Sequence, residues 1–575
     1  MMATKLFCAL LFSVCKFQAD GGSIVVNTTS GWYKGKMIEM NNQLVYAFLN
    51  VTYGQPPIGP NRFRPPQAAP HSNGIIQADR PAQACYQKID TTYPGFQGTE
   101  MWNPEGGMTE SCLTLNIWTP ANAHNAPVIV WIFGGGFSTG SPSLYLYNGS
   151  TMAAYSGIVV VNINYRLNVF GFFYMNDTEA PPNVGLLDQR LALEWVQKNI
   201  AGFGGDPSQV TLMGESAGAA SVMAHLHAVK SWPLFKYAIV QSGAVTLPWA
   251  NVEKSDLLKH SIMFAHQLNC NGSRSQMLDC LREQSPTKIL STTENVWSSS
   301  FLHSYFVPVL RDELFFGKEG YENVLQGVTK NTSVLLGYNE DEGSFWLPTC
   351  LAQFFNITSE ETTDLPEMAE LVNLTFSFLT EKQRSYATDY YRSETNDVRG
   401  MLSSMVGDYY FTCGILDLAE SLAQHNIPVY LFNFNYRSES NPWPQWMGVM
   451  HGYEIEFIFG GPLNRKGEQH EEDVRMSKMM MEYSNSFIRH GMPFAISPGA
   501  AHWPAYTQDN RAYTSFSSDG AVLKLKPLRD SCDMFKRLQS GDLSSTDSGQ
   551  RQAFQSPFLI ICIPMTWMNL RTIIS

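Results

Sequence analysis

Charged residues are scarce in this 575-residue sequence: they make up 16% of it, whereas hydrophobic residues make up 44%. The sequence also lacks low-complexity tracts, internal repeats and any linker rich in proline, glycine or serine. These absences exclude a disordered chain and a repeat protein, because the first has little apolar surface to bury and the second shows a recurring motif. We therefore expect one large globular domain, because α/β folds often accommodate a chain of this length.

Positive charge is in deficit as well. Lysine and arginine number 39 against 51 aspartates and glutamates, which gives a formal net charge of −12. A chain of this sign repels phosphate backbones and raises the local concentration of small cations. Nucleic acid is therefore excluded as a partner, and a small cationic ligand is favoured.

The N-terminus has the pattern of an export signal. Lys5 precedes the apolar run Leu6 to Val14, and a cleavage site near Ala19 makes residues 1–19 a signal peptide. Export fits the N-x-S/T glycosylation sequons. These begin at Asn27, Asn50, Asn148, Asn176, Asn271, Asn331, Asn356 and Asn373. Of ten cysteines, two lie in the signal, and sequence alone permits several pairings of the rest.

The C-terminal tail, residues 537–575, changes from polar (540–552) to apolar (558–570). The apolar run is too short and too interrupted for a transmembrane helix. Small residues at 544–545 or 548–549, a polar spacer and an apolar end resemble a signal for a GPI anchor. The alternative is a soluble secreted protein with a disordered end, and both remain open.

Short apolar runs predict buried strands, and a helical pattern from Leu187 to Asn199 separates two of them. Strand–helix–strand order gives a parallel sheet, so we predict an α/β fold and one domain over residues 20–536. The predicted strands are Val128–Phe133, Ile158–Ile163, Val210–Met213, Ala238–Val240, Val334–Leu336, Val429–Phe434 and Ala521–Leu525.

A candidate nucleophile stands in Gly214-Glu-Ser216-Ala-Gly218, directly after one predicted strand and before the small-residue helix 217–226. This is the context of a nucleophile elbow, in which a sharp turn exposes the serine. The glycines leave room for that turn, and the N-terminus of the helix favours developing negative charge. The alternative is an incidental turn, which the position between strand and helix makes the weaker reading.

A glycine run upstream, Gly134-Gly135-Gly136, follows another predicted strand and could aim backbone N–H groups at an acyl oxygen. We predict an oxyanion hole made by the amides of Gly135, Gly136 and Ala217, where losing one donor costs about 3 kcal/mol. A flexible loop is the alternative reading of a glycine triplet alone. A serine also needs a basic histidine and a carboxylate, in the order serine, acid, histidine. Twelve histidines leave that choice open.

With these motifs and three further segments, the sequence resembles the cholinesterase and type B carboxylesterase family, closest to the acetylcholinesterases, from about residue 25 to 536. The further segments are Gly185–Gln197, Phe203–Pro207 and Gln241–Gly243. The resemblance implies an α/β-hydrolase fold, with a large, mostly parallel sheet flanked by helices and long insertions.

The resemblance also implies a catalytic triad and three disulfides. Glu342 is the triad acid and His451 the base that activates Ser216 for acyl-enzyme chemistry, which needs no cofactor and no metal. The implied disulfides are Cys85–Cys112, Cys270–Cys280 and Cys413–Cys532, which leave Cys350 and Cys562 unassigned.

Within the family, the segment Glu100-Met-Trp102-Asn-Pro is similar to that of acetylcholinesterases, where this tryptophan forms the floor of the choline site. Phe345 is implied as a second wall. Aromatic faces suit a quaternary ammonium, worth about 2 kcal/mol when desolvated. The alternative for each ring is a place in the core. The resemblance adds Glu215, Tyr147 and Glu454 near the cation, Trp249 at the base of the site and Asp90 near its mouth.

Departures from the family concern the acyl pocket. Leu302 and Ser304 stand where acetylcholinesterases place two phenylalanines, which implies a roomier pocket, and Trp346 stands where a phenylalanine is usual and refills part of that space. Ser138 and Thr349 replace aromatic residues of the peripheral site, so peripheral ligands should bind weakly.

The sequence thus predicts an extracellular serine esterase, at a synapse or cell surface, whose substrate is a small cationic ester of the acetylcholine type. The preference between acetyl and butyryl esters stays open, and so does the formation of a homodimer. One alternative is a broad-specificity neutral carboxylesterase, favoured by the enlarged acyl pocket. The other is a catalytically silent adhesion ectodomain on the same fold, disfavoured because every candidate catalytic residue is present.

Overall fold

The computed structural model describes residues 23–293, 301–355, 357, 368–392, 397–465, 471–495, 501–527 and 530–540. The predicted signal peptide, most of the predicted tail and Cys562 lie outside these ranges. Within them, no helix combines the length and the apolar character needed to cross a bilayer.

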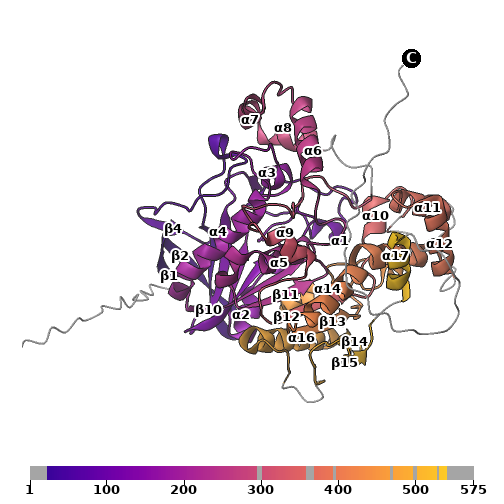
Figure 1. The fold of residues 1–575 in the computed structure, drawn as a ribbon. Helices are drawn as coiled ribbons and strands as arrows, with labels where there is room; N and C mark the ends of the chain where they lie inside the picture. Colours follow the sequence, from indigo (N-terminus) through magenta and orange to yellow (C-terminus); the bar gives the residue numbers. More distant parts are fainter. Residues whose placement is uncertain are drawn as a thin grey trace, which may run out of the picture.

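A 13-stranded sheet runs through the molecule (Figure 1). Its order is β1-β2-β3-β7-β9-β8-β10-β11-β12-β13-β14-β15, with β4 paired to β2. From β9 through β8 to β14 neighbouring strands are parallel, while the pairs toward both edges are antiparallel apart from the short parallel pair β2–β4. The strands are β1 (Ser23–Thr28), β2 (Gly31–Met40), β3 (Gln43–Thr52), β4 (Ile75–Gln77), β7 (Thr114–Pro120), β8 (Ala126–Ile132), β9 (Val159–Ile163), β10 (Gly205–Glu215), β11 (Tyr237–Gln241), β12 (Val334–Asn339), β13 (Val429–Phe434), β14 (Ala512–Ser517) and β15 (Gly520–Leu525). The pair β5 (Ala84–Cys85) and β6 (Met108–Thr109) forms a separate small sheet.

Helices cover both faces of the sheet, and further helices lie away from it. The helices α5 and α16 both contact β8 and β10, with α5 above the sheet and α16 below it in Figure 1. The helices are α1 (Gln97–Glu100), α2 (Ser150–Ser156), α3 (Asn168–Phe172), α4 (Val184–Asn199), α5 (Ala217–His227), α6 (Lys254–Gln267), α7 (Arg274–Glu283), α8 (Pro286–Thr293), α9 (Gly320–Leu325), α10 (Trp346–Cys350), α11 (Met368–Thr375), α12 (Glu381–Arg392), α13 (Val398–Gly407), α14 (Cys413–Gln424), α15 (Ile455–Ile458), α16 (Glu471–His490) and α17 (Asp530–Ser540), with a π-helical turn, Asp408–Thr412, before α14.

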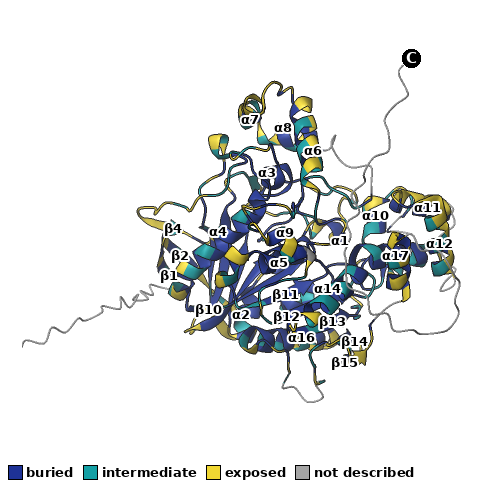
Figure 2. Cartoon of the chain, in the orientation of Figure 1, coloured by how far each residue is buried: buried dark blue, intermediate teal, exposed yellow. Residues whose placement is uncertain are grey.

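Burial explains why the sequence marks the central strands clearly. Every residue of β8 and of β9 is buried, as expected for parallel strands covered on both faces, and Figure 2 shows the strands dark and the outer helix surfaces exposed. The predicted α/β-hydrolase fold and its seven strands are confirmed. The last predicted strand, β15, runs antiparallel to β14 at the edge. The three expected disulfides are present.

Candidate active site

Ser216 stands on a strained turn between a strand and a helix. Strand β10 ends at Glu215 and α5 begins at Ala217, and Ser216 between them has φ 56° and ψ −124°. A non-glycine residue in such a conformation costs about 1–3 kcal/mol and persists only where its surroundings hold it. Here the Ser216 N–H donates to the carbonyl oxygen of Gln241 at the end of β11, at 2.8 Å. The turn therefore has the geometry of a nucleophile elbow.

The glycines around Ser216 are required by packing. A Cβ on Gly218 would overlap the carbonyl oxygen of Ile132 in β8, and one on Gly214 would overlap the backbone of Gly218. A Cβ on Gly243 would overlap the carbonyl oxygen of Ser216 itself. Backbone atoms cannot yield as a flexible side chain can, so only glycine lets α5 pack this closely on the sheet.

The glycine run lies against this turn. A Cβ on Gly134 would lie 2.7 Å from the carbonyl oxygen of Glu215 and 2.9 Å from Cβ of Ser216. Gly135 and Gly136 have φ of 101° and 59°, which favour glycine. Among the described residues, no hydrogen bond uses the amides of Gly135, Gly136 or Ala217. These three amides are available donors near the turn, and their role as an oxyanion hole stays a prediction.

His451 and Glu342 meet through a bridge between two loops. Asp341 and Met450 form an isolated β-bridge, which brings their neighbours Glu342 and His451 together. Nδ1 of His451 lies 2.5 Å from Oε2 of Glu342, and both side chains are buried. The other carboxylate oxygen of Glu342 accepts the N–H of Asn339 at 2.8 Å. The carboxylate is thus held against Nδ1, and Nε2 is the ring nitrogen that points away from Glu342.

Nε2 of His451 faces the residue next to the predicted nucleophile. It lies 3.1 Å from Oε1 of Glu215, and the hydrogen bonds of the described residues include none between His451 and the Ser216 hydroxyl. Glu215 and Ser216 are adjacent, so the imidazole lies at the elbow with its second nitrogen turned to the carboxylate. The catalytic roles of Ser216, Glu342 and His451 stay predictions.

A third buried carboxylate completes a charged cluster. Glu454 accepts from the side-chain amides of Gln241 at 2.8 Å and of Asn339 at 2.6 Å. Burial raises the pKa of Glu215 to about 8, and the charges of Glu454 and Glu342 add to the rise. Burial lowers the pKa of His451, but the charges of Glu215 and Glu342 outweigh it and raise that pKa to about 9. The cluster therefore holds a proton tightly, which a general base must give up before it can act.

Aromatic rings surround the imidazole. The rings of Trp102 and Phe345 meet edge to face at 6.4 Å, and the Phe345 ring lies 6.4 Å from His451. A Cβ on Gly452 would lie 3.2 Å from the Trp102 ring and 3.4 Å from Oε1 of Glu215, so Trp102 is close to both the histidine loop and the carboxylate. The structure thus brings both predicted walls of a cation site to the candidate triad.

Of the remaining aromatic candidates, Trp346 contacts the ring of His451 directly. The Trp346 ring lies 5.2 Å away. Tyr147 is buried against Trp131, and burial with the charge of Glu215 raises its pKa well above the usual value. The Trp249 indole donates to the Tyr410 carbonyl at 2.9 Å.

Asp90 and the acyl-pocket candidates make no hydrogen bond, ion pair or ring contact with His451 among the described residues. Asp90 pairs through its backbone with the side chain of Asn103, beside Trp102. Leu302 has φ 51° and is half-buried, as is Ser304, and no contact of the described residues joins either to Ser216. Their role as the acyl pocket stays a prediction.

Three site residues were missed by sequence analysis. Phe411 lies 4.7 Å from the His451 ring and stacks on Trp346 at 5.6 Å, and Trp443 contacts Phe345 at 5.8 Å. Asn339 bonds both Glu342 and Glu454. It lies three residues after the predicted strand Val334–Leu336 and three residues before the acid, and this spacing is the one signal that could have indicated it. No comparable pattern marks Phe411 or Trp443.

These features define a class of protein. A strained serine at the carboxyl end of a mostly parallel sheet, beside free amides and a histidine–carboxylate pair, is the arrangement of α/β-hydrolases with a serine nucleophile. In the described ranges, no group of three or more histidine, cysteine or acidic side chains is placed to hold a metal ion.

The chain belongs to the carboxylesterase family, whose model matches residues 22–535. Its relatives include an acetylcholinesterase of Bungarus fasciatus, 36% identical, with 92% of this chain and 88% of the relative covered. A cholinesterase of Mus musculus is 35% identical over 92% of this chain and 91% of its own. An acetylcholinesterase of Electrophorus electricus is 36% identical over 92% and 91%. The chain is accordingly a carboxylic ester hydrolase that acts through a serine.

Proposed function

We propose that this enzyme hydrolyses choline esters through an acyl-enzyme on Ser216. The observation that carries the proposal is the meeting of Trp102, Phe345 and the Glu215 carboxylate beside the His451–Glu342 pair. Rings and negative charge attract a quaternary ammonium, and the reactive groups stand next to them. Two of the relatives are named acetylcholinesterases, which supports the same substrate class.

In the proposed mechanism, His451 removes the proton of Ser216 as the hydroxyl attacks the ester carbonyl. For this step Nε2 must take the Ser216 hydroxyl as its partner in place of Glu215, which lies 3.1 Å away. Glu342 stabilises the imidazolium, and the amides of Gly135, Gly136 and Ala217 bind the oxyanion. His451 then protonates the leaving choline, and water releases the acid by the reverse sequence.

We also propose that the enzyme works outside the cell. Every sequon asparagine within the described residues is exposed, and three disulfides are formed, as expected for an oxidising compartment. Membrane attachment through a GPI anchor and formation of a homodimer remain hypotheses drawn from the sequence.

The proposal is tested with three substrates on purified enzyme: acetylthiocholine, butyrylthiocholine and a neutral aryl ester. We expect kcat/KM to be highest for a choline ester. We expect Trp102→Ala to lower kcat/KM for choline esters by about 30-fold, which corresponds to about 2 kcal/mol, and to leave the neutral ester nearly unchanged. Equal losses for both would refute the cation site.

A second candidate is a neutral carboxylesterase, favoured by one observation. Neither Leu302 nor Ser304 supplies an aromatic ring to restrict the acyl group. This candidate predicts that bulky neutral esters are turned over faster than acetylthiocholine, so the same three substrates decide between the two.

A further inference from the structure

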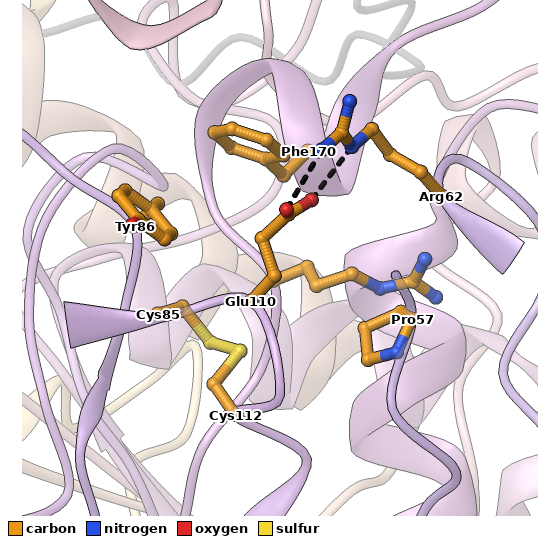
Figure 3. A pocket seen from close by; sticks show the side chains of 8 residues that line it. Pro57, Arg62, Cys85, Tyr86, Glu110, Cys112 and Phe170 are labelled. Atoms are coloured by element: carbon orange, nitrogen blue, oxygen red, sulfur yellow. Dashed lines mark hydrogen bonds and ion pairs between the residues drawn. A yellow bond between two sulfur atoms is a disulfide. The ribbon is translucent and has the colours of Figure 1, made fainter. Parts of the chain in front are cut away.

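The disulfide loop Cys85–Cys112 carries both Asp90 and Trp102, and its base is held firmly. Besides the disulfide, Nε and Nη2 of Arg62 lie 2.6 Å and 2.7 Å from the two carboxylate oxygens of Glu110 (Figure 3). Arg62 is buried and also donates to the carbonyl oxygen of Gln284 at 2.7 Å. The base of the loop is thus fixed, and contacts further along the loop decide where Trp102 stands.

Tyr93, in the middle of the disulfide loop, makes contacts with the segment that follows Phe345. Its hydroxyl oxygen lies 3.1 Å from the carbonyl oxygen of Pro348 and 3.0 Å from that of Phe355. Pro348 lies in α10, which starts directly after Phe345. Burial and the nearby charge of Asp90 raise the pKa of Tyr93, so the hydroxyl keeps its single proton and donates it to one of these two carbonyl oxygens or shares it between them.

Hydrogen bonds along the chain connect Tyr93 to Trp102. The Phe96 N–H and the Thr99 hydroxyl donate to the carbonyl oxygen of Tyr93 at 3.1 Å and 3.2 Å. The Trp102 N–H donates to the carbonyl oxygen of Thr99 at 3.1 Å. A displacement of Tyr93 would therefore move the indole of Trp102 relative to α10.

We propose that the Tyr93 hydroxyl is a positioning group that fixes the spacing of Trp102 and Phe345, and thereby sets the affinity for a quaternary ammonium. This inference rests on the proposed function. The two rings stand 6.4 Å apart, and the attraction of a cation to a ring requires it within about 6 Å of the ring centre. A small increase in the distance between the two rings would remove the contact of the bound cation with one of them. Ser216, His451 and Glu342 would stay in place.

The test compares Tyr93→Phe with Tyr86→Phe. Tyr86 lies in the same loop, its ring is 6.1 Å from that of Phe170 near the disulfide (Figure 3), and its hydroxyl makes no hydrogen bond among the described residues. We expect Tyr93→Phe to raise KM for acetylthiocholine about 3- to 10-fold, the range for one hydrogen bond. We expect kcat to stay the same, and the neutral aryl ester and Tyr86→Phe to behave as wild type.

Hydrogen exchange of residues 85–112, followed by mass spectrometry, provides a readout that does not depend on substrate. Faster exchange in Tyr93→Phe, with a KM effect confined to cationic esters, supports the proposal. Unchanged exchange would overturn it, and so would equal KM effects on cationic and neutral esters. A wild-type enzyme without preference for choline esters would instead refute the proposed function, and the exchange result would still show whether Tyr93 holds the loop.

Discussion

Replacing Glu215 by glutamine removes one charge from the candidate site and keeps the shape of the side chain. The carboxylate lies 3.1 Å from Nε2 of His451, and both groups are buried. An anion favours the charged imidazolium, so its loss lowers the pKa of His451 from about 9. The neutral, catalytically competent imidazole then forms at lower pH.

The size of the shift follows from distance and burial. Unit charges about 4 Å apart attract by about 4 kcal/mol at an effective dielectric constant of 20, or about 3 pKa units. Burial raises the pKa of Glu215 itself to about 8, so near neutral pH the carboxyl carries only part of its charge. We therefore expect the ascending limb of the kcat/KM profile to move down by about 1 unit in Glu215→Gln.

The assay is kcat/KM against pH with acetylthiocholine, since this ratio reports the pKa values of the free enzyme. Glu105→Gln is the control, because Glu105 is exposed and lies three residues beyond Trp102. An ascending limb that stays at the wild-type pH in Glu215→Gln would refute the electrostatic argument. A shift in the control of equal size would refute it too.

Three further predictions concern packing, the oxyanion loop and acid stability. Gly218→Ala should destabilise the fold by more than about 3 kcal/mol, measured by urea unfolding, because its Cβ would overlap the Ile132 carbonyl. Gln87→Ala should lower kcat several-fold with little change in KM, because the Gln87 amide makes two hydrogen bonds with the backbone of Gly140, at 2.7 Å and 2.8 Å, and so holds the loop four residues after Gly136. Burial lowers the pKa of His227 to about 4, so the unfolded state binds a proton more readily, and the unfolding free energy should fall by about 3 kcal/mol as pH drops from 6.5 to 4.

The first of these has a matched control variant, and the other two have outcomes that would contradict them. Gly400→Ala in α13 meets only the side chain of Asp397 and should unfold like wild type. A Gln87→Ala enzyme with unchanged kcat would contradict the role of Gln87 in the loop. For the acid effect, His227→Gln should flatten the pH dependence between 4 and 6.5, and an equally steep curve would count against His227 as its source.

The sequence predicts the centre of the fold better than its edges. Strands such as β8 and β9 are buried throughout and almost entirely apolar because both faces are covered, and this leaves a clear pattern. Strand β2 alternates between buried and exposed residues at the antiparallel edge, and its pattern gives no comparable apolar run. The hairpin strands β1, β2 and β3 join the sheet because β3 pairs with β7, about 60 residues later in the chain. This pairing depends on tertiary contacts, which local composition does not encode.

The site divides in a similar way. Ser216 and the glycine loop stand in local patterns, because a sharp turn and a close backbone approach require glycine at fixed spacing. Glu342 and His451 come from distant loops, so only the family resemblance identifies them. The position of the Phe411 ring, in the π-helical turn, and the orientation of the His451 Nε2 toward Glu215 depend on tertiary packing, and no local pattern predicts either.

Covalent labelling tests the central claim most directly. A radiolabelled organophosphate reacts only with a serine made nucleophilic by its neighbours, and peptide mapping by mass spectrometry locates the adduct. We predict one adduct per chain, on Ser216, slowed by tetramethylammonium and absent in His451→Ala. An adduct on another residue, or labelling of Ser216 that persists in His451→Ala at the wild-type rate, would contradict the account.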